Sequence, residues 1–186
     1  MASGGIGLYV HVPYCLRKCS YCAFASSDKP SDITGMCTAL NAEFIQRTDG
    51  LDQSIRTFYA GGGTPTLLPP EFWRRLIGKV RSPGLREITI ESNPAVLDHR
   101  GYSTLLLAGF NRISLGVQSF DDSALKRLGR IHSAEDARES VRQIRESGFR
   151  NISIDLIYGH PGQTIQGQKT DLEEVLRFYA PAFIPL

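Results

Sequence analysis

Three cysteines lie close together near the start of the chain, at Cys15, Cys19 and Cys22. Soft thiolate ligands at such short spacing are typical of iron-sulfur clusters. Three thiolates can hold three irons of a four-iron cluster, which leaves the fourth iron open to a substrate or cofactor. The alternatives are reduced core cysteines or a structural zinc ion with His11 as fourth ligand, although zinc sites usually take cysteine pairs from two separated loops. The spacing favours the cluster and leaves zinc open.

The remaining cysteine and the composition indicate the class of protein. Cys37 falls on a predicted helix, and we interpret it as a small buried hydrophobic residue, not a ligand. Cysteines crowded toward the N-terminus do not form a disulfide framework, which fits a cytoplasmic, reducing compartment. The 186 residues are 41% hydrophobic and 22% charged with a net charge of +2, which predicts one soluble globular domain without a nucleic-acid partner. No apolar run approaches the length of about 18 residues that a membrane span needs.

Strand-like runs alternate with amphipathic segments along the whole chain. The predicted strands are residues 7–12, 54–60, 86–92, 111–117 and 151–158, and the predicted helices are residues 36–48, 70–80, 98–107, 121–128, 134–147 and 167–178. The clearest helix begins at Ser133, with Asp136 as its capping-box partner, and stops at Gly148. This order predicts an α/β fold with a parallel sheet, either open or closed as a barrel.

Side-chain alternation predicts that polar residues share one face of the sheet. Residues two apart on a strand point to the same side, and Glu91, Gln118 and Asp155 all fall on the face opposite the Ile, Leu and Val residues of their strands. Buried parallel strands are usually apolar on both faces. All three residues stand toward the carboxyl ends of their strands, where barrel enzymes carry their chemistry. We therefore expect a lumen that holds a ligand.

A glycine-rich segment, Gly61-Gly62-Gly63-Thr64-Pro65, follows the second predicted strand at once. Glycines let the backbone approach a ligand closely and expose its polar groups, although a tight turn explains such a run equally well. The spacing matches neither a dinucleotide-binding motif nor a P-loop.

Five segments together resemble the radical S-adenosylmethionine superfamily, in the branch built around oxygen-independent coproporphyrinogen III oxidase. They are residues 9–24 (YVHVPYCLRKCSYCAF), 58–68 (FYAGGGTPTLL), 87–94 (EITIESNP), 112–132 (RISLGVQSFDDSALKRLGRIH) and 151–164 (NISIDLIYGHPGQT). The resemblance implies a (βα)6 barrel. Residues 1–186 would form its N-terminal part, truncated at the start of a sixth strand over residues 182–186, with the C-terminal remainder absent from this chain. We read the chain as a fragment of a longer protein.

The resemblance also implies cofactors and their contacts. The family's ligands to a four-iron four-sulfur cluster carry over to Cys15, Cys19 and Cys22. Its S-adenosylmethionine contacts carry over to Tyr9, Tyr21, Gly62, Gly63, Thr64, Glu91, Gln118, Arg130 and Asp155. On grounds of charge, Arg130 suits the methionine carboxylate, and Glu91 or Asp155 suits ribose hydroxyls or the ammonium group. The glycine-rich segment suits the amino end of the methionine moiety.

Two histidines stand inside the matching segments. His160 occupies a position where the family usually has an aliphatic residue, which changes the lining expected there. His132 is interpreted as a structural, hydrogen-bonding histidine in preference to a catalytic one. No catalytic residue is assigned.

The mechanism that the resemblance implies is one-electron reduction of S-adenosylmethionine at the open iron, giving methionine and a 5′-deoxyadenosyl radical. Within the branch, the oxidase has a further cysteine where this chain has Phe24, and a long extension before its first strand, which here begins by about residue 7. Both differences favour the heme chaperone subgroup, as does the segment from Gly129 to His132. The expected partners are heme or another tetrapyrrole, a recipient hemoprotein and an electron donor. A radical enzyme acting on a tetrapyrrole or another substrate, and a non-radical metal-binding module, are the alternatives.

Overall fold

The strands form one parallel sheet in which each strand pairs with the next strand of the sequence. The computed structural model describes residues 5–28, 30–51, 54–80 and 84–179. The strands are β1 (Ile6–Val12), β2 (Ile55–Gly62), β3 (Glu87–Ser92), β4 (Arg112–Gln118) and β5 (Asn151–Leu156), in the sheet order β1-β2-β3-β4-β5. Such a sequential order is that of a barrel wall and not of a doubly wound sheet. The predicted α/β fold, part of a (βα) barrel, is confirmed; the expected sixth strand over residues 182–186 lies outside the described residues.

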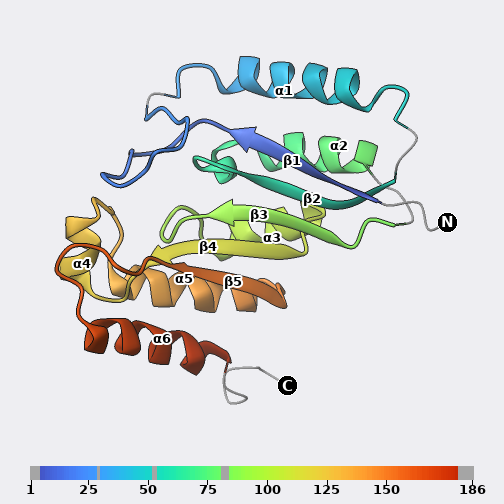
Figure 1. Cartoon of the computed structure of the whole chain (residues 1–186). Helices are drawn as coiled ribbons and strands as arrows, with labels where there is room; N and C mark the ends of the chain where they lie inside the picture. Colours follow the sequence, from blue (N-terminus) through green and yellow to red (C-terminus); the bar gives the residue numbers. More distant parts are fainter. Residues whose placement is uncertain (1–4, 29, 52–53, 81–83, 180–186) are drawn as a thin grey trace.

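The helices follow the strands in alternation and cover one side of the sheet (Figure 1). They are α1 (Ile33–Thr48), α2 (Pro70–Val80), α3 (His99–Ala108), α4 (Asp122–Arg127), α5 (Ala134–Glu146) and α6 (Ile165–Tyr179), with a 3-10 turn η1 (Pro65–Leu67). Within the described residues, no helix is both long and apolar enough to cross a membrane.

Local capping decides where the helices begin. The predicted capping box is confirmed, because Ser133 and Asp136 each accept from the other's backbone N–H at the start of α5. Helix α1 begins three residues before the predicted start, because the Asp32 carboxylate accepts from Gly35 N at 2.7 Å and caps an earlier turn.

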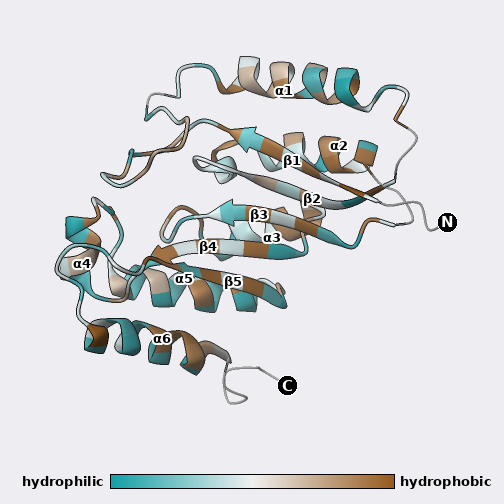
Figure 2. Cartoon of the chain, viewed as in Figure 1, coloured by the Kyte–Doolittle hydropathy of each residue, from teal (hydrophilic) through white to brown (hydrophobic). Residues whose placement is uncertain are grey.

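The core lies between the sheet and the helices α2, α3 and α5. Phe58 of β2, Trp73 of α2 and Phe110 before β4 meet edge to face or tilted, with ring centroids 5.7 to 6.2 Å apart. The Trp73 indole donates to Pro65 O at 3.2 Å, which ties the turn after the glycine-rich segment to the core. The arrowheads of β1 and β3 are coloured hydrophilic in Figure 2, so polarity rises toward the carboxyl ends of these strands.

The carboxyl ends of the strands differ from the prediction, and one of them departs from a regular ladder. Strand β2 runs two residues beyond the predicted end, because Gly61 and Gly62 still pair with His11 and Val12 of β1. The pairing of β4 with β5 shifts register between Gly116 and Gln118, and Gln118 has a φ of +73°. A bulge of this kind redirects a side chain at a strand end. Strand β5 stops at Leu156, two residues before the predicted end.

Candidate functional site

A cavity of about 280 Å³ opens at the carboxyl ends of the strands. It gathers all but one of the predicted site residues. They are Cys15, Cys19, Cys22, Tyr21, Gly62, Gly63, Thr64, Glu91, Gln118, Arg130 and Asp155. The expectation that Glu91, Gln118 and Asp155 share one face of the sheet is confirmed, and the cysteine loop lies beside that face. Segments more than one hundred residues apart in the chain therefore line one cavity.

The cysteine loop is held in shape by backbone contacts at both of its ends. Cys15 N donates to Ser27 O at 2.9 Å, and Ser27 N donates to Pro13 O at 2.7 Å. Within the loop, Cys22 N donates to Cys19 O at 3.1 Å. These contacts fix where the loop leaves and rejoins the end of β1. Burial raises the pKa of the Cys15 thiol, while hydrogen bonds from Ser26 and Thr64 partly oppose this.

The structure does not support the zinc alternative with His11. His11 Nε2 lies 3.0 Å from Ala25 O, and His11 Nδ1 lies 3.1 Å from the Tyr9 hydroxyl, so both ring nitrogens already have partners. In the described parts of the chain, no three His, Cys, Asp or Glu side chains gather closely enough to hold a single metal ion. A four-iron cluster binds each thiolate to a different iron, so its ligands need not converge on one point.

The glycine-rich segment packs so closely that none of its glycines has room for a side chain. A Cβ at Gly63 would lie 2.4 Å from Tyr14 O and 2.9 Å from Cys15 Sγ. A Cβ at Gly62, whose φ is +111°, would lie 2.7 Å from the His11 ring. Glycine is therefore required here because Gly62 lies directly against the end of β1 and Gly63 lies directly against the start of the cysteine loop.

The backbone N–H groups of this segment are already used inside the protein. Gly62 N donates to Glu91 Oε2 at 2.9 Å, Gly63 N to Val12 O at 2.7 Å, and Thr64 N to Tyr14 O at 2.6 Å. The polar backbone groups that the segment can offer to a ligand are therefore carbonyl oxygens, which accept hydrogen bonds. This agrees with the expectation that the segment suits the amino end of a methionine moiety. The segment can bind a hydrogen-bond donor such as an ammonium group, and it does not suit a carboxylate.

Two carboxylates on the inner face are held by neighbouring hydroxyl groups. The Tyr59 hydroxyl donates to Glu91 Oε1 at 2.9 Å, and the Ser114 hydroxyl lies 3.1 Å and 3.0 Å from the two Asp155 oxygens. Burial raises the pKa of Glu91, while the bonds from Tyr59 and Gly62 favour its ionised form. Burial, with Glu91 next in effect, raises the pKa of Tyr59 to about 12, so Tyr59 keeps the proton that it donates.

The opposite wall of the cavity carries a fixed positive charge at Arg130. Its Nη2 donates to Asn93 Oδ1 and to Gly116 O, both at 2.6 Å, and its Nη1 donates to Cys19 Sγ at 3.4 Å. Asn93 Nδ2 in turn donates to Thr64 Oγ1 at 3.3 Å. The buried Arg130 Nε has no partner within the described part of the chain. Asn93 thus links the glycine-rich segment to the guanidinium, and Nη1 is the end of Arg130 that faces the cysteine loop.

Two tyrosines predicted as cofactor contacts differ in position. Tyr21 lines the cavity, and burial raises its pKa to about 12, with Arg130 opposing the rise. Tyr9 is the one predicted site residue that does not line this cavity, and its role as a cofactor contact stays a prediction. Its ring stacks on Tyr59 with centroids 5.9 Å apart and its hydroxyl meets His11, so it lines a separate hollow of about 310 Å³ between β1 and α1.

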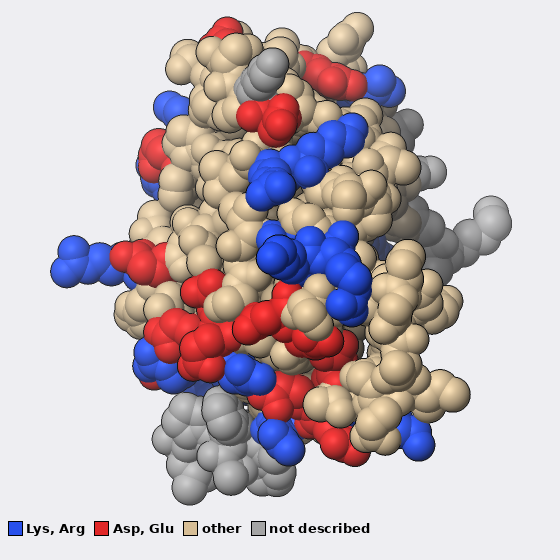
Figure 3. Space-filling view, turned by 90° about the vertical axis from the view of Figure 1, so that its left-hand side faces the viewer, with Lys and Arg blue, Asp and Glu red and all other residues tan. Residues whose placement is uncertain are grey.

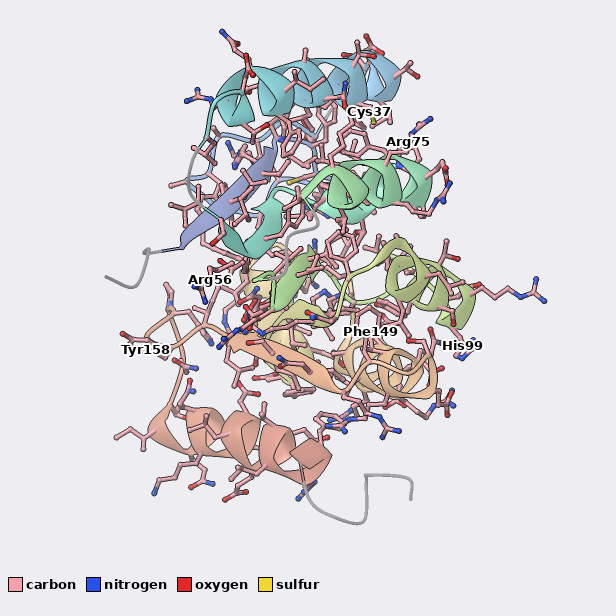
Figure 4. All side chains as sticks on the ribbon, turned by 90° about the vertical axis from the view of Figure 1, so that its right-hand side faces the viewer. Cys37, Arg56, Arg75, His99, Phe149 and Tyr158 are labelled. Carbon is pink, nitrogen blue, oxygen red and sulfur yellow. The ribbon has the colours of Figure 1, made fainter. Side chains whose placement is uncertain are left out.

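The remaining residues that the sequence singled out lie outside the cavity. His132 is buried with Nε2 3.1 Å from Val117 O, as a structural histidine would be. His160 is also buried, and it lines a smaller hollow of about 210 Å³ near the start of α6. Cys37 packs between α1 and α2, close to Arg75 (Figure 4), and is half-buried against the core, where the sequence predicted a small buried hydrophobic residue.

Four residues that shape the site were not predicted from the sequence. Tyr59 and Ser114 hold the two carboxylates, Asn93 holds Arg130, and Gly116 leaves room for Gln118 and Asn93. A Cβ on Gly116 would lie 2.9 Å from Gln118 Nε2 and 3.1 Å from Asn93 Oδ1. The signal was present for two of them, because Tyr59 and Ser114 alternate onto the same face as Glu91 and Asp155.

The groups that line the cavity fit an iron-sulfur cluster and, beside it, a cofactor that carries an ammonium group and a carboxylate. Three thiols line one side of the cavity, and carbonyl acceptors, two carboxylates and one guanidinium surround the remainder. A volume of about 280 Å³ is near the lower end of small-molecule sites.

Comparison with known proteins agrees with this geometry. Residues 9–178 match the Radical SAM superfamily. The heme chaperone HemW of Haemophilus influenzae is 34% identical over 187 residues, covering 95% of this chain and 49% of the relative. HemW of Bacillus subtilis is 39% identical over 167 residues, covering 85% of this chain and 44% of the relative.

Solved structures show the same relationship. The coproporphyrinogen III oxidase HemN of Escherichia coli superposes with a TM-score of 0.80 at 26% identity, covering 97% of this chain and 46% of HemN. The chain spans about half the length of the relatives that it matches. With the cysteine loop, the glycine-rich segment and the parallel strands all in place, the chain belongs to the Radical SAM superfamily.

Proposed function

We propose that the protein containing this chain is a heme chaperone that carries a four-iron four-sulfur cluster and S-adenosylmethionine. Membership of the Radical SAM superfamily implies these two cofactors. The relatives named heme chaperone HemW, which match 85% and 95% of the chain at 39% and 34% identity, support the choice of heme as cargo. The single observation that carries the proposal is the cavity in which three cysteines, two carboxylates and an arginine meet.

Cys15, Cys19 and Cys22 would hold the cluster, which leaves one iron for S-adenosylmethionine. When bound, the cluster supplies the electron for reductive cleavage of that cofactor. The glycine-rich segment lies close behind the cluster loop, since Gly63 packs against Cys15. Arg130 Nη1, which donates to Cys19 Sγ, places a positive charge beside a thiolate ligand and stabilises the negative charge there.

The charges of the cavity give S-adenosylmethionine an orientation. The acceptor-only backbone of the glycine-rich segment and the Glu91 carboxylate suit its ammonium group or ribose hydroxyls, and Arg130 suits its carboxylate. Asp155, held by Ser114, supplies a second acceptor pair for ribose hydroxyls. Tyr21 and Gln118 complete the lining. The chain's own residues thus bind and orient the cofactor.

The partners that this function requires are heme, a recipient hemoprotein and an electron donor. We place the protein in the cytoplasm, because its four cysteines are free thiols and the cluster needs reducing conditions.

A second candidate is oxidative decarboxylation of coproporphyrinogen III, favoured by the TM-score of 0.80 with HemN. We rank it lower because position 24, where the resemblance expects the oxidase to have a further cysteine, is an exposed phenylalanine at the cavity.

The test uses the full-length protein with its cluster reconstituted under anaerobic conditions. About four irons and four sulfides per chain, binding of S-adenosylmethionine, and transfer of bound heme to an apo-hemoprotein are the expected results. One zinc ion without sulfide would contradict the cluster. A protein that binds cluster and S-adenosylmethionine but neither binds nor transfers heme would contradict the chaperone function alone.

A further inference from the structure

Exposed positive charges surround the cysteine loop on the surface of the protein. Arg17 and Lys18 stand within the loop, and Lys126 and Arg127 form the last turn of α4; all four are exposed. None of the four forms an ion pair within the described part of the chain. Figure 3 shows Lys and Arg side chains gathered near the middle of this face. We call these four residues the basic patch.

The two halves of the basic patch are joined by direct contacts. The Ser20 hydroxyl donates to Arg127 O at 3.4 Å, and a Cβ on Gly129 would lie 3.2 Å from Ser20 N. The cysteine loop therefore rests on the end of α4, although more than one hundred residues separate them in the chain. These contacts place the loop segment that carries Arg17 and Lys18 beside the end of α4 that carries Lys126 and Arg127.

Part of the basic patch directly adjoins the cysteine ligands, because Arg17 lines the same cavity as the three cysteines. Lys18 precedes Cys19 directly, and the three cysteine side chains are only partly buried. Electron transfer falls off steeply with distance, so a donor must dock next to the cluster that it reduces. Charge complementarity then favours a donor with an acidic surface.

We propose that the basic patch is the docking surface for a small acidic one-electron carrier protein that reduces the cluster. This inference rests on the proposed function. One electron leaves the donor and enters the cluster, so the donor is oxidised by one electron and the cluster is reduced by one; no covalent bond changes in this step.

The neighbouring charges favour a protein partner over a polyanion. Asp121 and Asp122 at the start of α4 and Asp155 at the end of β5 are exposed, and Figure 3 shows a zone of Asp and Glu below the positive charges. A nucleic acid or an anionic membrane extends over both zones and is repelled by the acidic one. A small protein covers the basic patch alone, and the acidic zone then sets its orientation.

The test follows reduction of the reconstituted cluster in the full-length protein, by stopped-flow absorbance, with flavodoxin hydroquinone as the acidic donor. Arg17→Gln/Lys18→Gln and Lys126→Gln/Arg127→Gln are each expected to slow this reduction about tenfold at low salt, and to weaken the binding of oxidised flavodoxin to a similar degree. Added salt should reduce both effects. Dithionite is too small to need docking, and its rate with Lys126→Gln/Arg127→Gln should stay unchanged.

The matched control removes two exposed charges from the opposite edge of the sheet. Arg86 and Arg150 directly precede β3 and β5, and Arg86→Gln/Arg150→Gln changes the net charge by the same amount. Equal slowing in this control, or no slowing in either patch variant, would overturn the inference. Patch-dependent binding of RNA or anionic vesicles with flavodoxin reduction unaffected would also overturn it. If the reconstituted protein holds no cluster that dithionite can reduce, that result overturns the proposed function itself.

Discussion

The contrast between the three loop cysteines and Cys37 gives a sharp test at the level of single residues. Cys15→Ala, Cys19→Ala and Cys22→Ala should each lose most of the iron and sulfide after anaerobic reconstitution, because each thiolate holds a different iron. Cys37→Ala is the matched control, since Cys37 packs between α1 and α2 and does not line the cavity. Iron and sulfide analysis of the four variants decides the matter. An equal loss in Cys37→Ala would contradict the ligand assignment.

Tyr59 should contribute to cofactor binding without touching the cluster. Its hydroxyl donates to Glu91, and a hydrogen bond to a charged group contributes about 1.5–3 kcal/mol. Tyr59→Phe should therefore raise the Kd for S-adenosylmethionine by about tenfold or more, with the iron content unchanged. Tyr158→Phe removes the same group from an exposed side chain (Figure 4) and should leave the Kd as it is. Equal effects in the two variants, measured by equilibrium dialysis, would contradict a positioning role.

His132 should make the stability of the protein depend on pH. Burial lowers its pKa to about 4, against an ordinary value of 6.5, with Arg130 contributing to the shift. The unfolded chain therefore takes up the proton first as the pH falls, so the stabilising effect of neutral His132 is complete above about pH 6.5 and is lost toward pH 4. The free energy of unfolding should fall by about 2 kcal/mol between pH 7 and pH 5 from this residue. Urea titrations of His132→Gln should show a smaller fall; an unchanged pH dependence would contradict this.

At the level of elements, the glycine-rich segment and the cysteine loop should form one packed unit. Gly63→Ala would place a Cβ 2.4 Å from Tyr14 O, so the loop must move and the variant should bind much less iron. Gly78→Ala on α2 is the control, because nothing lies within 4 Å of its added Cβ. Gly78→Ala should raise the free energy of unfolding by about 0.5–1 kcal/mol, because alanine is favoured over glycine in a helix interior. Full iron binding by Gly63→Ala would show that the contact is not required.

The elements themselves were largely predictable, and the contacts between them were not. Period-two alternation was enough to place Glu91, Gln118 and Asp155 on one face, because the pleat of a strand fixes that choice. The alternation could not separate the two tyrosines, because Tyr9 and Tyr59 fall on the same face. Only the structure shows that the Tyr9 hydroxyl meets His11 and that the Tyr59 hydroxyl donates to Glu91. Asn93 follows the end of β3, where no periodicity applies, so its bond to Arg130 required the fold. The backbone N–H groups of the glycine-rich segment donate to residues that are distant in the sequence, so these hydrogen bonds also required the fold.

For the whole molecule, the two tetrapyrrole functions differ in what must lie beside the cofactor. A chaperone can hold heme elsewhere on the protein, whereas an oxidase must place a propionate beside the reactive carbon of its cofactor. A displacement of about 1 Å in such an arrangement can cost roughly a hundredfold in rate.

We therefore expect the full-length protein to transfer heme and not to convert coproporphyrinogen III to protoporphyrinogen IX. Phe24, exposed at the cavity, contributes no thiolate where the resemblance expects one in the oxidase, which points the same way. The assay is anaerobic, with the cluster reconstituted, S-adenosylmethionine and a strong reductant present, and HemN of Escherichia coli as the positive control. Porphyrin formation at about one turnover per second or faster would contradict the chaperone proposal, because that is an ordinary enzymatic rate. Heme transfer with at most slow cleavage of S-adenosylmethionine would agree with it, since the cavity would then bind its cofactor without a substrate in reach.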